Sequence, residues 1–225
     1  MRNSISLSKY EELNARLLLL LKDLWNRVIF LDMETDVRDE NFLRNERILL
    51  ISMARRVSGY LSLNGVEVKS FVLESYSDSG EFELLVKFDR ELSKIRPLAV
   101  VGFGLRSYDI PLLAIKKERY NGHRNLWKIV DLVEQALHID LCHILRYYFQ
   151  VKRFEEIYLH EDFSDLPLRR AKSMVSDLSR TEKGHHIYNL WVRDKEKLRE
   201  YCEGEVFDML LVTERLIELL ARKER

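Results

Sequence analysis

The sequence feature that most constrains the fold is a short apolar run, Arg27 to Leu31, which leads directly into two alternating acids, Asp32 and Glu34. A nearly continuous apolar run of this length is typical of a central strand covered on both faces. Side chains alternate along a strand, so both carboxylates point to one face, separated by roughly 6–7 Å of strand rise. Asp36 follows the same alternation and is a weaker candidate. Strands also commonly end in acidic turn residues, so this pattern alone does not distinguish a site from a turn.

The rest of the chain alternates between strand and helix patterns. Asn64-Gly65 separates two alternating segments, which is the strongest short-range hairpin pattern because both turn positions need positive φ. Apolar runs at 27–31, 48–57, 66–73, 98–103 and 137–141 predict five strands. Helical patterns predict an N-terminal helix, a helix at 81–95, a helix that begins at Pro111 and a separate helix that follows the fifth strand and ends at Tyr148. The remainder is predicted to be helical, with breaks at Pro167 and Gly184 and a final helix at 195–220.

These elements predict an α/β fold around one mixed five-stranded sheet, with three antiparallel strands first and two strands in helix-crossover units after them. At 225 residues and 46% apolar content the chain can bury one sizeable core. We therefore expect one domain at 27–225, with an N-terminal helix within 1–26 packed on it. The apolar block Leu17 to Leu21 is too short and too closely flanked by charges for a secretory signal or a membrane span. A cytoplasmic protein with no membrane partner is expected.

The charge balance, the cysteines and the histidines limit which kinds of binding site the chain can have. Thirty-seven basic and 37 acidic residues cancel, so any contact with phosphate must be local rather than due to a strongly basic domain. Cys142 and Cys202 have no close partner in sequence and fit buried reduced thiols. The adjacent His185 and His186 lack the spacing of a structural zinc site, so an exposed or substrate-facing loop is expected there.

A further acid, Asp109, follows a predicted strand and a glycine-rich loop and immediately precedes a predicted helix. A carboxylate in that position lies at the carboxyl end of a strand, where open α/β sheets place their sites. The alternative is an ordinary N-cap, because Asp is among the best capping residues and Pro111 follows closely.

The last group of candidates lies in the predicted final helix, where Tyr201 and Glu205 have the i, i+4 spacing that places them side by side. A solvated charged face is the alternative. Four carboxylates drawn together from a strand, a junction and a helix would repel one another unless divalent cations such as Mg²⁺ or Mn²⁺ neutralised them. Two such ions can activate water and stabilise both oxygens of an in-line phosphoryl displacement, which is the chemistry of phosphodiester hydrolysis.

Three blocks in this order resemble the DEDD superfamily of 3′→5′ exonucleases, in particular its tyrosine subclass and the proofreading domain of family-B DNA polymerases. VIFLDMETD (28–36) is similar to that family's first Asp-x-Glu block, GFGLRSYDIPLL (102–113) to its second block, and LREYCEGEVFDMLLVTERL (198–216) to its Tyr-x-x-x-Asp helix. The resemblance implies a ribonuclease-H-like fold and a stand-alone exonuclease domain. It also implies hydrolysis of single-stranded nucleic acid, DNA more than RNA, to nucleoside 5′-monophosphates with two Mg²⁺ or Mn²⁺ ions.

The resemblance assigns a role to each matching residue. Asp32 would bridge both metals, Glu34 would hold the site of the attacking water, and Asp109 would bind the second metal. Tyr201 would orient the water, and Glu205 would make the fourth metal contact.

Two positions depart from the family's pattern. Glu205 replaces an aspartate, and its extra methylene moves the carboxylate by about 1.5 Å, comparable to displacements that cost about 10²-fold in rate. Asp208, one turn further on, is a substitute candidate for this ligand. Gly104 replaces an asparagine, so a side-chain hydrogen bond near the substrate strand is missing. These departures leave open a non-catalytic nucleic-acid-binding or assembly module, and a 3′→5′ exoribonuclease is a further alternative.

Candidate substrate contacts come from the second block and the helix after it. Phe103 and Tyr108 are placed near the terminal nucleotide by the resemblance, although either also suits a core, and Arg106, Lys116 and Lys117 are basic candidates. Basic residues with interleaved aromatics gather at 116–128, 146–154 and 169–172, a combination that holds single-stranded nucleic acid. Charge runs are also commonly only solvated. A polymerase or repair protein is the partner that this function suggests.

Overall fold

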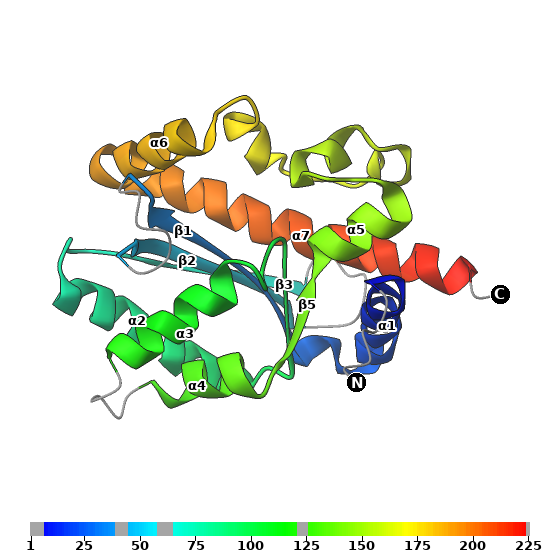
Figure 1. Ribbon diagram of the computed structural model, residues 1–225, viewed down its shortest axis with the longest axis horizontal. Coiled ribbons are helices and arrows are strands. Elements are labelled where there is room, and N and C mark those ends of the chain that lie inside the picture. The colour runs from blue at the N-terminus through cyan, green and yellow to red at the C-terminus, as the bar shows by residue number, and fades with distance from the viewer. Residues whose placement is uncertain (1–6, 39–44, 58–64, 121–125, 224–225) are drawn as a thin grey trace, which may run out of the picture.

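A computed structural model describes residues 7–38, 45–57, 65–120 and 126–223. Its strands are β1 (Val28–Asp36), β2 (Arg47–Arg56), β3 (Val66–Val72), β4 (Ala99–Gly102) and β5 (Leu137–Asp140). They form one sheet in the order β3-β2-β1-β4-β5 (Figure 1), in which β1, β2 and β3 are antiparallel and β4 and β5 run parallel to β1. The predicted fold class is confirmed, and the arrangement is ribonuclease-H-like.

Helices cover both faces of the sheet. In chain order they are α1 (Leu7–Leu20), η1 (Leu21–Arg27), α2 (Asp78–Ile95), α3 (Asp109–Arg119), α4 (Trp127–Glu134), α5 (Leu141–Phe149), η3 (Phe154–Leu159), η4 (Glu161–Phe163), η5 (Ala171–Val175), α6 (Arg180–Arg193) and α7 (Lys195–Lys223). Figure 1 shows α2, α3 and α4 on one side of the sheet and α6 and the long α7 on the other. Within the described ranges, no helix is both long enough and apolar enough to cross a membrane.

The two faces of β1 belong to different cores. Ile29 and Leu31 pack in the core that contains α2 and α4, whereas Val28 and Phe30 pack in the core that contains α5 and most of the buried face of α7. Asp32 and Glu34 continue the Val28 and Phe30 alternation, so their carboxylates point to the side of the sheet that α7 covers.

β1 continues through Asp32 and Glu34, which were expected at the end of this strand, and reaches Asp36. The backbone ladder to β2 runs past all three acids. β4 pairs with β1 only from Val28 to Phe30. The acidic part of β1 therefore extends beyond the end of β4, and the chain that follows Gly102 turns beside it.

One expected helix break, with the loop expected after it, is wrong, and one helix was not predicted. Gly184, His185 and His186 lie inside α6, which begins with a capping box between Ser179 and Glu182 rather than after a loop at Gly184. α4 was not predicted at all. Part of the predicted turn at Asn64-Gly65 and the predicted helix end at Asn121-Gly122 lie outside the described residues.

A buried ion pair fixes α7 to the sheet. Arg56 on β2 donates from Nε to Glu214 Oε1 at 2.8 Å and from Nη2 to Oε2 at 2.5 Å, and both side chains are only 2% exposed. Trp25 Nε1 donates to the same Glu214 oxygen at 2.9 Å. One carboxylate thus joins β2, α7 and the segment that precedes β1, and it sets the position of α7 over the sheet.

Arg56→Met should lower the free energy of unfolding by about 3–5 kcal/mol, because it leaves the Glu214 carboxylate buried without its counterion. Arg56→Met/Glu214→Gln should recover most of that loss, since it removes both charges and keeps an acceptor for Trp25. Arg199→Met is the matched control on an exposed pair of α7, Arg199 with Glu196, and should cost less than about 1 kcal/mol. Urea unfolding followed by circular dichroism measures all three. A double variant as unstable as Arg56→Met would contradict this account.

Candidate active site

A cleft of about 380 Å³ opens at the end of β1 that carries the acids. The structure brings the acids of the first two sequence blocks to its wall. Tyr201 and Glu205 of α7 are buried behind that wall, Tyr201 close enough for the Glu34 and Asp32 carboxylates to raise its pKa and Glu205 next to Lys172. The lining side chains that bear on chemistry are Asp32, Glu34, Phe103, Tyr108, Asp109, Lys172 and Lys183.

The first-block acids meet α7 at close range. One carboxylate oxygen each from Asp32 and Glu34 and the Cys202 Sγ all lie within 4.8 Å of one another. Cys202 is fully buried, as predicted, whereas Cys142 is only half-buried, and neither forms a disulfide. Hard carboxylate oxygens at this spacing suit a cation such as Mg²⁺ or Mn²⁺.

Burial and mutual repulsion dominate the charge state of the aspartates. Burial raises the pKa of Asp32, although the Lys172 ammonium partly opposes that rise. Burial also raises the pKa of Asp109 well above its usual value, and the neighbouring Asp32 carboxylate raises it further. Asp32 Oδ2 is buried with no hydrogen-bond partner. Such a pair is more stable with a proton or a cation between its members than without one.

Two lysines enter this acidic cluster; Lys183 was not singled out from the sequence, and Lys172 was expected only as part of the basic cluster at 169–172. Lys172 Nζ, from η5, lies 2.5 Å from Glu205 Oε1, and Lys183 Nζ, from α6, lies 3.0 Å from Glu34 Oε1. Burial lowers the pKa of Lys183, but the Glu34 and Asp32 carboxylates more than offset that effect and hold the pKa above its usual value. Neither lysine belongs to a recognisable sequence block, which is why the pattern of acids did not reveal them.

Glycines allow the lysine-bearing segments to approach so closely. A Cβ on Gly184 would lie 2.3 Å from Val37 Cγ2, so α6 packs directly on the chain just after β1. A Cβ on Gly204 of α7 would lie 2.7 Å from the Cβ of Ala171, next to Lys172. Real Cβ contacts are not this short, so any side chain at either position would push a lysine-bearing segment outward.

Asp140, another residue missed from the sequence, organises the loop that carries Asp109. Its Oδ1 accepts from the backbone N–H groups of Gly104 at 2.9 Å and Cys142 at 3.0 Å, and its Oδ2 accepts from that of Arg106 at 3.1 Å. Gly104 has φ +76°, a left-handed conformation that favours glycine. The departure at Gly104 therefore suits the backbone of this loop. An acid at the end of the predicted strand 137–141 was the available clue to Asp140.

Tyr201 is the buried phenol of the site. Its side chain is 2% exposed, and its hydroxyl has no hydrogen-bond partner. Burial raises its pKa well above the usual value, and the Glu34 and Asp32 carboxylates raise it further. The phenol consequently remains protonated, so it can donate a hydrogen bond to a molecule in the site but cannot act as a base near neutral pH.

Asp208 serves the loop that leads to Lys172. Its carboxylate accepts from the backbone N–H groups of Arg169 at 2.7 Å and Arg170 at 2.9 Å, and from the Tyr158 hydroxyl at 3.2 Å. With both oxygens engaged in this way, Asp208 does not offer the substitute ligand that the sequence suggested.

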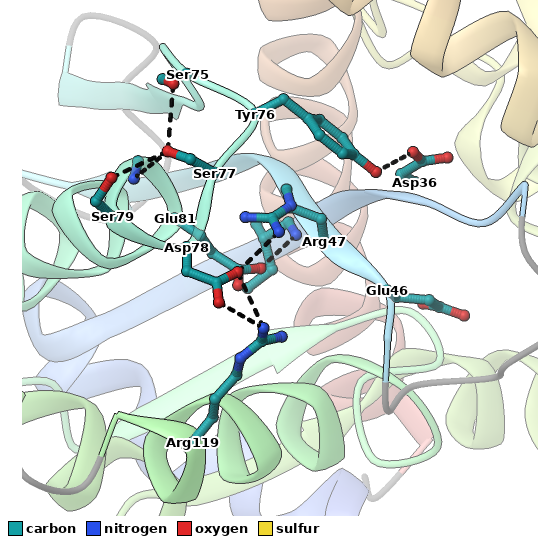
Figure 2. Close-up of polar contacts among 12 residues, drawn as sticks. Asp36, Glu46, Arg47, Ser75, Tyr76, Ser77, Asp78, Ser79, Glu81 and Arg119 are labelled. Carbon is teal, nitrogen blue, oxygen red and sulfur yellow. Dashed lines mark hydrogen bonds and ion pairs between the residues drawn. The ribbon is translucent and has the colours of Figure 1, made fainter.

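Asp36, the weaker candidate on β1, is engaged by other side chains. Tyr76 Oη donates to Asp36 Oδ2 at 2.5 Å (Figure 2), and Arg38 Nη2 donates to the same oxygen at 2.6 Å. Burial raises the pKa of Asp36, but the bonds from Arg38 and Tyr76 more than offset that effect and hold it below its usual value. Arg38 also stacks on the Tyr188 ring, 3.1 Å from its centroid. Asp36 thus belongs to a separate aromatic and cationic cluster.

The predicted substrate contacts separate into two groups. Phe103 and Tyr108 line the cleft, and the Tyr108 hydroxyl bonds to Glu46 and Thr35. Arg106 is exposed in the loop before α3. Lys117 Nζ lies 2.6 Å from Glu134, away from the lining of the cleft.

The expectation for Lys116 is wrong. Its side chain is fully buried, and its Nζ lies 2.8 Å from Glu81 Oε1, so it neutralises an internal acid and is not available to a nucleic acid. Nearby, Arg47 and Arg119 both bind Asp78 (Figure 2). The basic residues predicted to bind nucleic acid around 116–128 are therefore partly paired with acids of the same chain, namely the buried Glu81 and the exposed Asp78 and Glu134.

Comparisons with known proteins agree with this fold. No protein-family model and no curated protein matches the sequence. Among solved structures, the chain is similar to the family B DNA polymerase from the hyperthermophilic archaeon Pyrobaculum calidifontis, with a TM-score of 0.53 and 16% sequence identity. The match covers 86% of this chain and 24% of the polymerase chain. This chain thus spans about a quarter of that protein's length, and at this identity the likeness concerns the fold alone.

Gly184→Ala should lower the free energy of unfolding by about 1–3 kcal/mol, because the new methyl group overpacks against Val37. In a Val37→Ala background the same substitution should be neutral or stabilising by up to about 1 kcal/mol, since alanine is the better helix former. Urea unfolding of the four matched proteins measures the coupling. Stabilisation by Gly184→Ala in both backgrounds would contradict the close approach of α6 to β1.

Proposed function

We propose that the chain is a 3′→5′ exonuclease that hydrolyses single-stranded nucleic acid, DNA in preference to RNA, and releases nucleoside 5′-monophosphates. The observation that carries this proposal is the convergence of Asp32, Glu34 and Asp109 on one open cleft, with Asp32 Oδ2 buried and unpartnered. Buried carboxylates gathered without enough internal counterions are costly unless they serve a bound cation. The order and spacing of the three sequence blocks support the same reaction.

The donor set fits Mg²⁺ or Mn²⁺, since Asp32, Glu34 and Asp109 offer hard oxygen ligands on one wall of the cleft. When bound, such a cation polarises the scissile phosphate and lowers the pKa of the attacking water. The protein's own contribution is to hold the carboxylates in place through β1 and the Asp140-bonded loop.

Tyr201 is proposed to orient the attacking water. Its hydroxyl has no hydrogen-bond partner among the described residues and stays protonated, so it can donate a hydrogen bond to that water without removing a proton. Phe103 and Tyr108 form the aromatic part of the cleft wall, where a terminal base can stack. Base stacking is tolerant of sequence, as suits an enzyme that removes nucleotides one at a time.

Asp32→Asn and Asp109→Asn should each slow nucleotide release at least about 100-fold, because a lost metal ligand costs several kcal/mol of transition-state stabilisation. Glu200→Gln, an exposed acid beside Tyr201 on α7, is the matched control and should retain wild-type activity. The assay follows 5′-labelled single-stranded DNA and RNA ladders with Mg²⁺ or Mn²⁺. Equal degradation by wild type and Asp32→Asn, or none by wild type with either metal, would refute the enzyme; faster degradation of RNA would identify an exoribonuclease.

Tyr201→Phe should lower the turnover number about 10- to 100-fold through loss of water orientation. Cation binding and the free energy of unfolding should change little, because the hydroxyl has no partner to lose. Single-turnover nucleotide release and thermal unfolding measure the two effects. An unchanged rate would remove Tyr201 from the mechanism.

A second candidate function, a non-catalytic module that binds nucleic acid, is favoured by the two lysines. Lys172 and Lys183 already neutralise Glu205 and Glu34, which a site with no cation would require. This candidate predicts single-strand binding that is indifferent to Mn²⁺ and is not followed by hydrolysis. Robust hydrolysis with Mn²⁺ excludes it.

A further inference from the structure

The lysines of the acidic cluster cancel only part of its negative charge. Asp32, Glu34, Asp109 and Glu205 supply four carboxylates, and Lys172 and Lys183 supply two ammonium groups. Asp140 and Glu155 also act on this cluster, but Asp140 accepts three backbone N–H bonds and Glu155 pairs with Arg153. With the first six groups ionised, two negative charges remain, which one divalent cation cancels.

The two lysines are each assigned to one particular carboxylate. Lys172 lies 2.5 Å from Glu205, which is 1% exposed, and Lys183 lies 3.0 Å from Glu34, which is 7% exposed. Each of these glutamates is neutralised by an ammonium group at contact distance. Glu205 in particular has its Oε1 oxygen next to the Lys172 ammonium.

The two aspartates have no such counterion. Among the residues that the structure describes, none forms an ion pair or a side-chain hydrogen bond with the Asp109 carboxylate, which is 4% exposed and lines the cleft. Asp32 Oδ2 and the Tyr201 hydroxyl are likewise buried without partners. Both Glu205 oxygens also lack a hydrogen-bond partner among the described residues, although the Lys172 ammonium lies at ion-pair distance from Oε1. Asp32 differs from Glu205 in that no ammonium group in the described part of the chain lies at contact distance from its unpartnered oxygen.

The approach of the lysines is built into the packing. Gly184 follows Lys183 directly and lets α6 contact Val37, while Gly204 on α7 receives Ala171, the neighbour of Lys172. Asp208 fixes the backbone at Arg169 and Arg170, just before that segment. These three contacts fix the backbone segments that carry Lys172 and Lys183. The two ammonium groups are therefore positioned by the packing of the fold.

We propose that this site binds one divalent cation tightly, that Asp32 and Asp109 would hold it, and that Lys172 on Glu205 takes the place of a second cation. Glu34, which pairs with Lys183, lies close to Asp32 and would be the next ligand. This inference rests on the proposed function only in treating the cluster as a metal site. It replaces the two ions that the sequence resemblance implied with one ion and a fixed internal charge.

The test is the number of Mn²⁺ ions that the purified chain binds, measured by the loss of the free-Mn²⁺ electron paramagnetic resonance signal during a titration. Wild type should bind one Mn²⁺. Lys172→Met, which frees Glu205, should bind two Mn²⁺ ions. The affinity for its second ion should be at least tenfold higher than the affinity of wild type for any second ion. Lys172→Arg, the charge-preserving control, should still bind one. Asp109→Asn should weaken the single ion at least tenfold.

Lys172→Met/Glu205→Gln removes the whole pair and keeps the measurement useful if Lys172→Met alone does not fold. It should bind one ion, as wild type does, with circular dichroism confirming the fold. Three results would each overturn the inference: wild type binds two ions with similar affinity, wild type binds no ion, or Lys172→Met folds and binds the same number of ions as wild type. Nucleotide release is measured separately. If wild type binds two ions and hydrolyses the substrate with Mn²⁺, the one-ion inference fails and the proposed function stands. If wild type binds one ion and does not hydrolyse the substrate, the proposed function fails and the one-ion inference stands.

Discussion

Repulsion among buried carboxylates is the constraint on which the site depends. Asp32 and Glu34 point from β1 toward the side of the sheet covered by α7, and Asp109 joins them from the start of α3. Asp32 is partly buried and Glu34 and Asp109 are buried, so water screens their charges less than it screens surface charges, and the surrounding structure must supply part of the compensation. The positions of Lys172, Lys183 and the glycines next to them follow from this need.

Most of the fold was predictable because alternation and apolar periodicity report directly on burial. The helix at 81–95 and the final helix from Lys195 were recovered closely, since each has a long periodic face. The failures are local. α4 was not predicted, and Gly184 suggested a break because a glycine needed for close packing resembles a helix terminator.

The acids of the candidate site could be named from sequence because a strand and a helix each place them at a fixed spacing. Lys172, Lys183 and Asp140 could not, since each reaches its partner across a tertiary contact that no local period encodes. Lys116 is a residue that was predicted to contact substrate but does not belong to the site. It looked like part of a basic surface, whereas the packing of α3 against the core turns it inward to Glu81.

The length of the side chain at position 205 is explained by the same contact. An aspartate there would withdraw the carboxylate by roughly 1.5 Å, one carbon–carbon bond, from an ammonium group that now lies at 2.5 Å. Lys172 would then be left buried without its partner, close to Asp32, whose charge it already moderates. Glu205 and Lys172 therefore form one ion pair that requires the longer side chain. The glutamate at a position where the DEDD family has aspartate is explained by the presence of the Lys172 ammonium beside it.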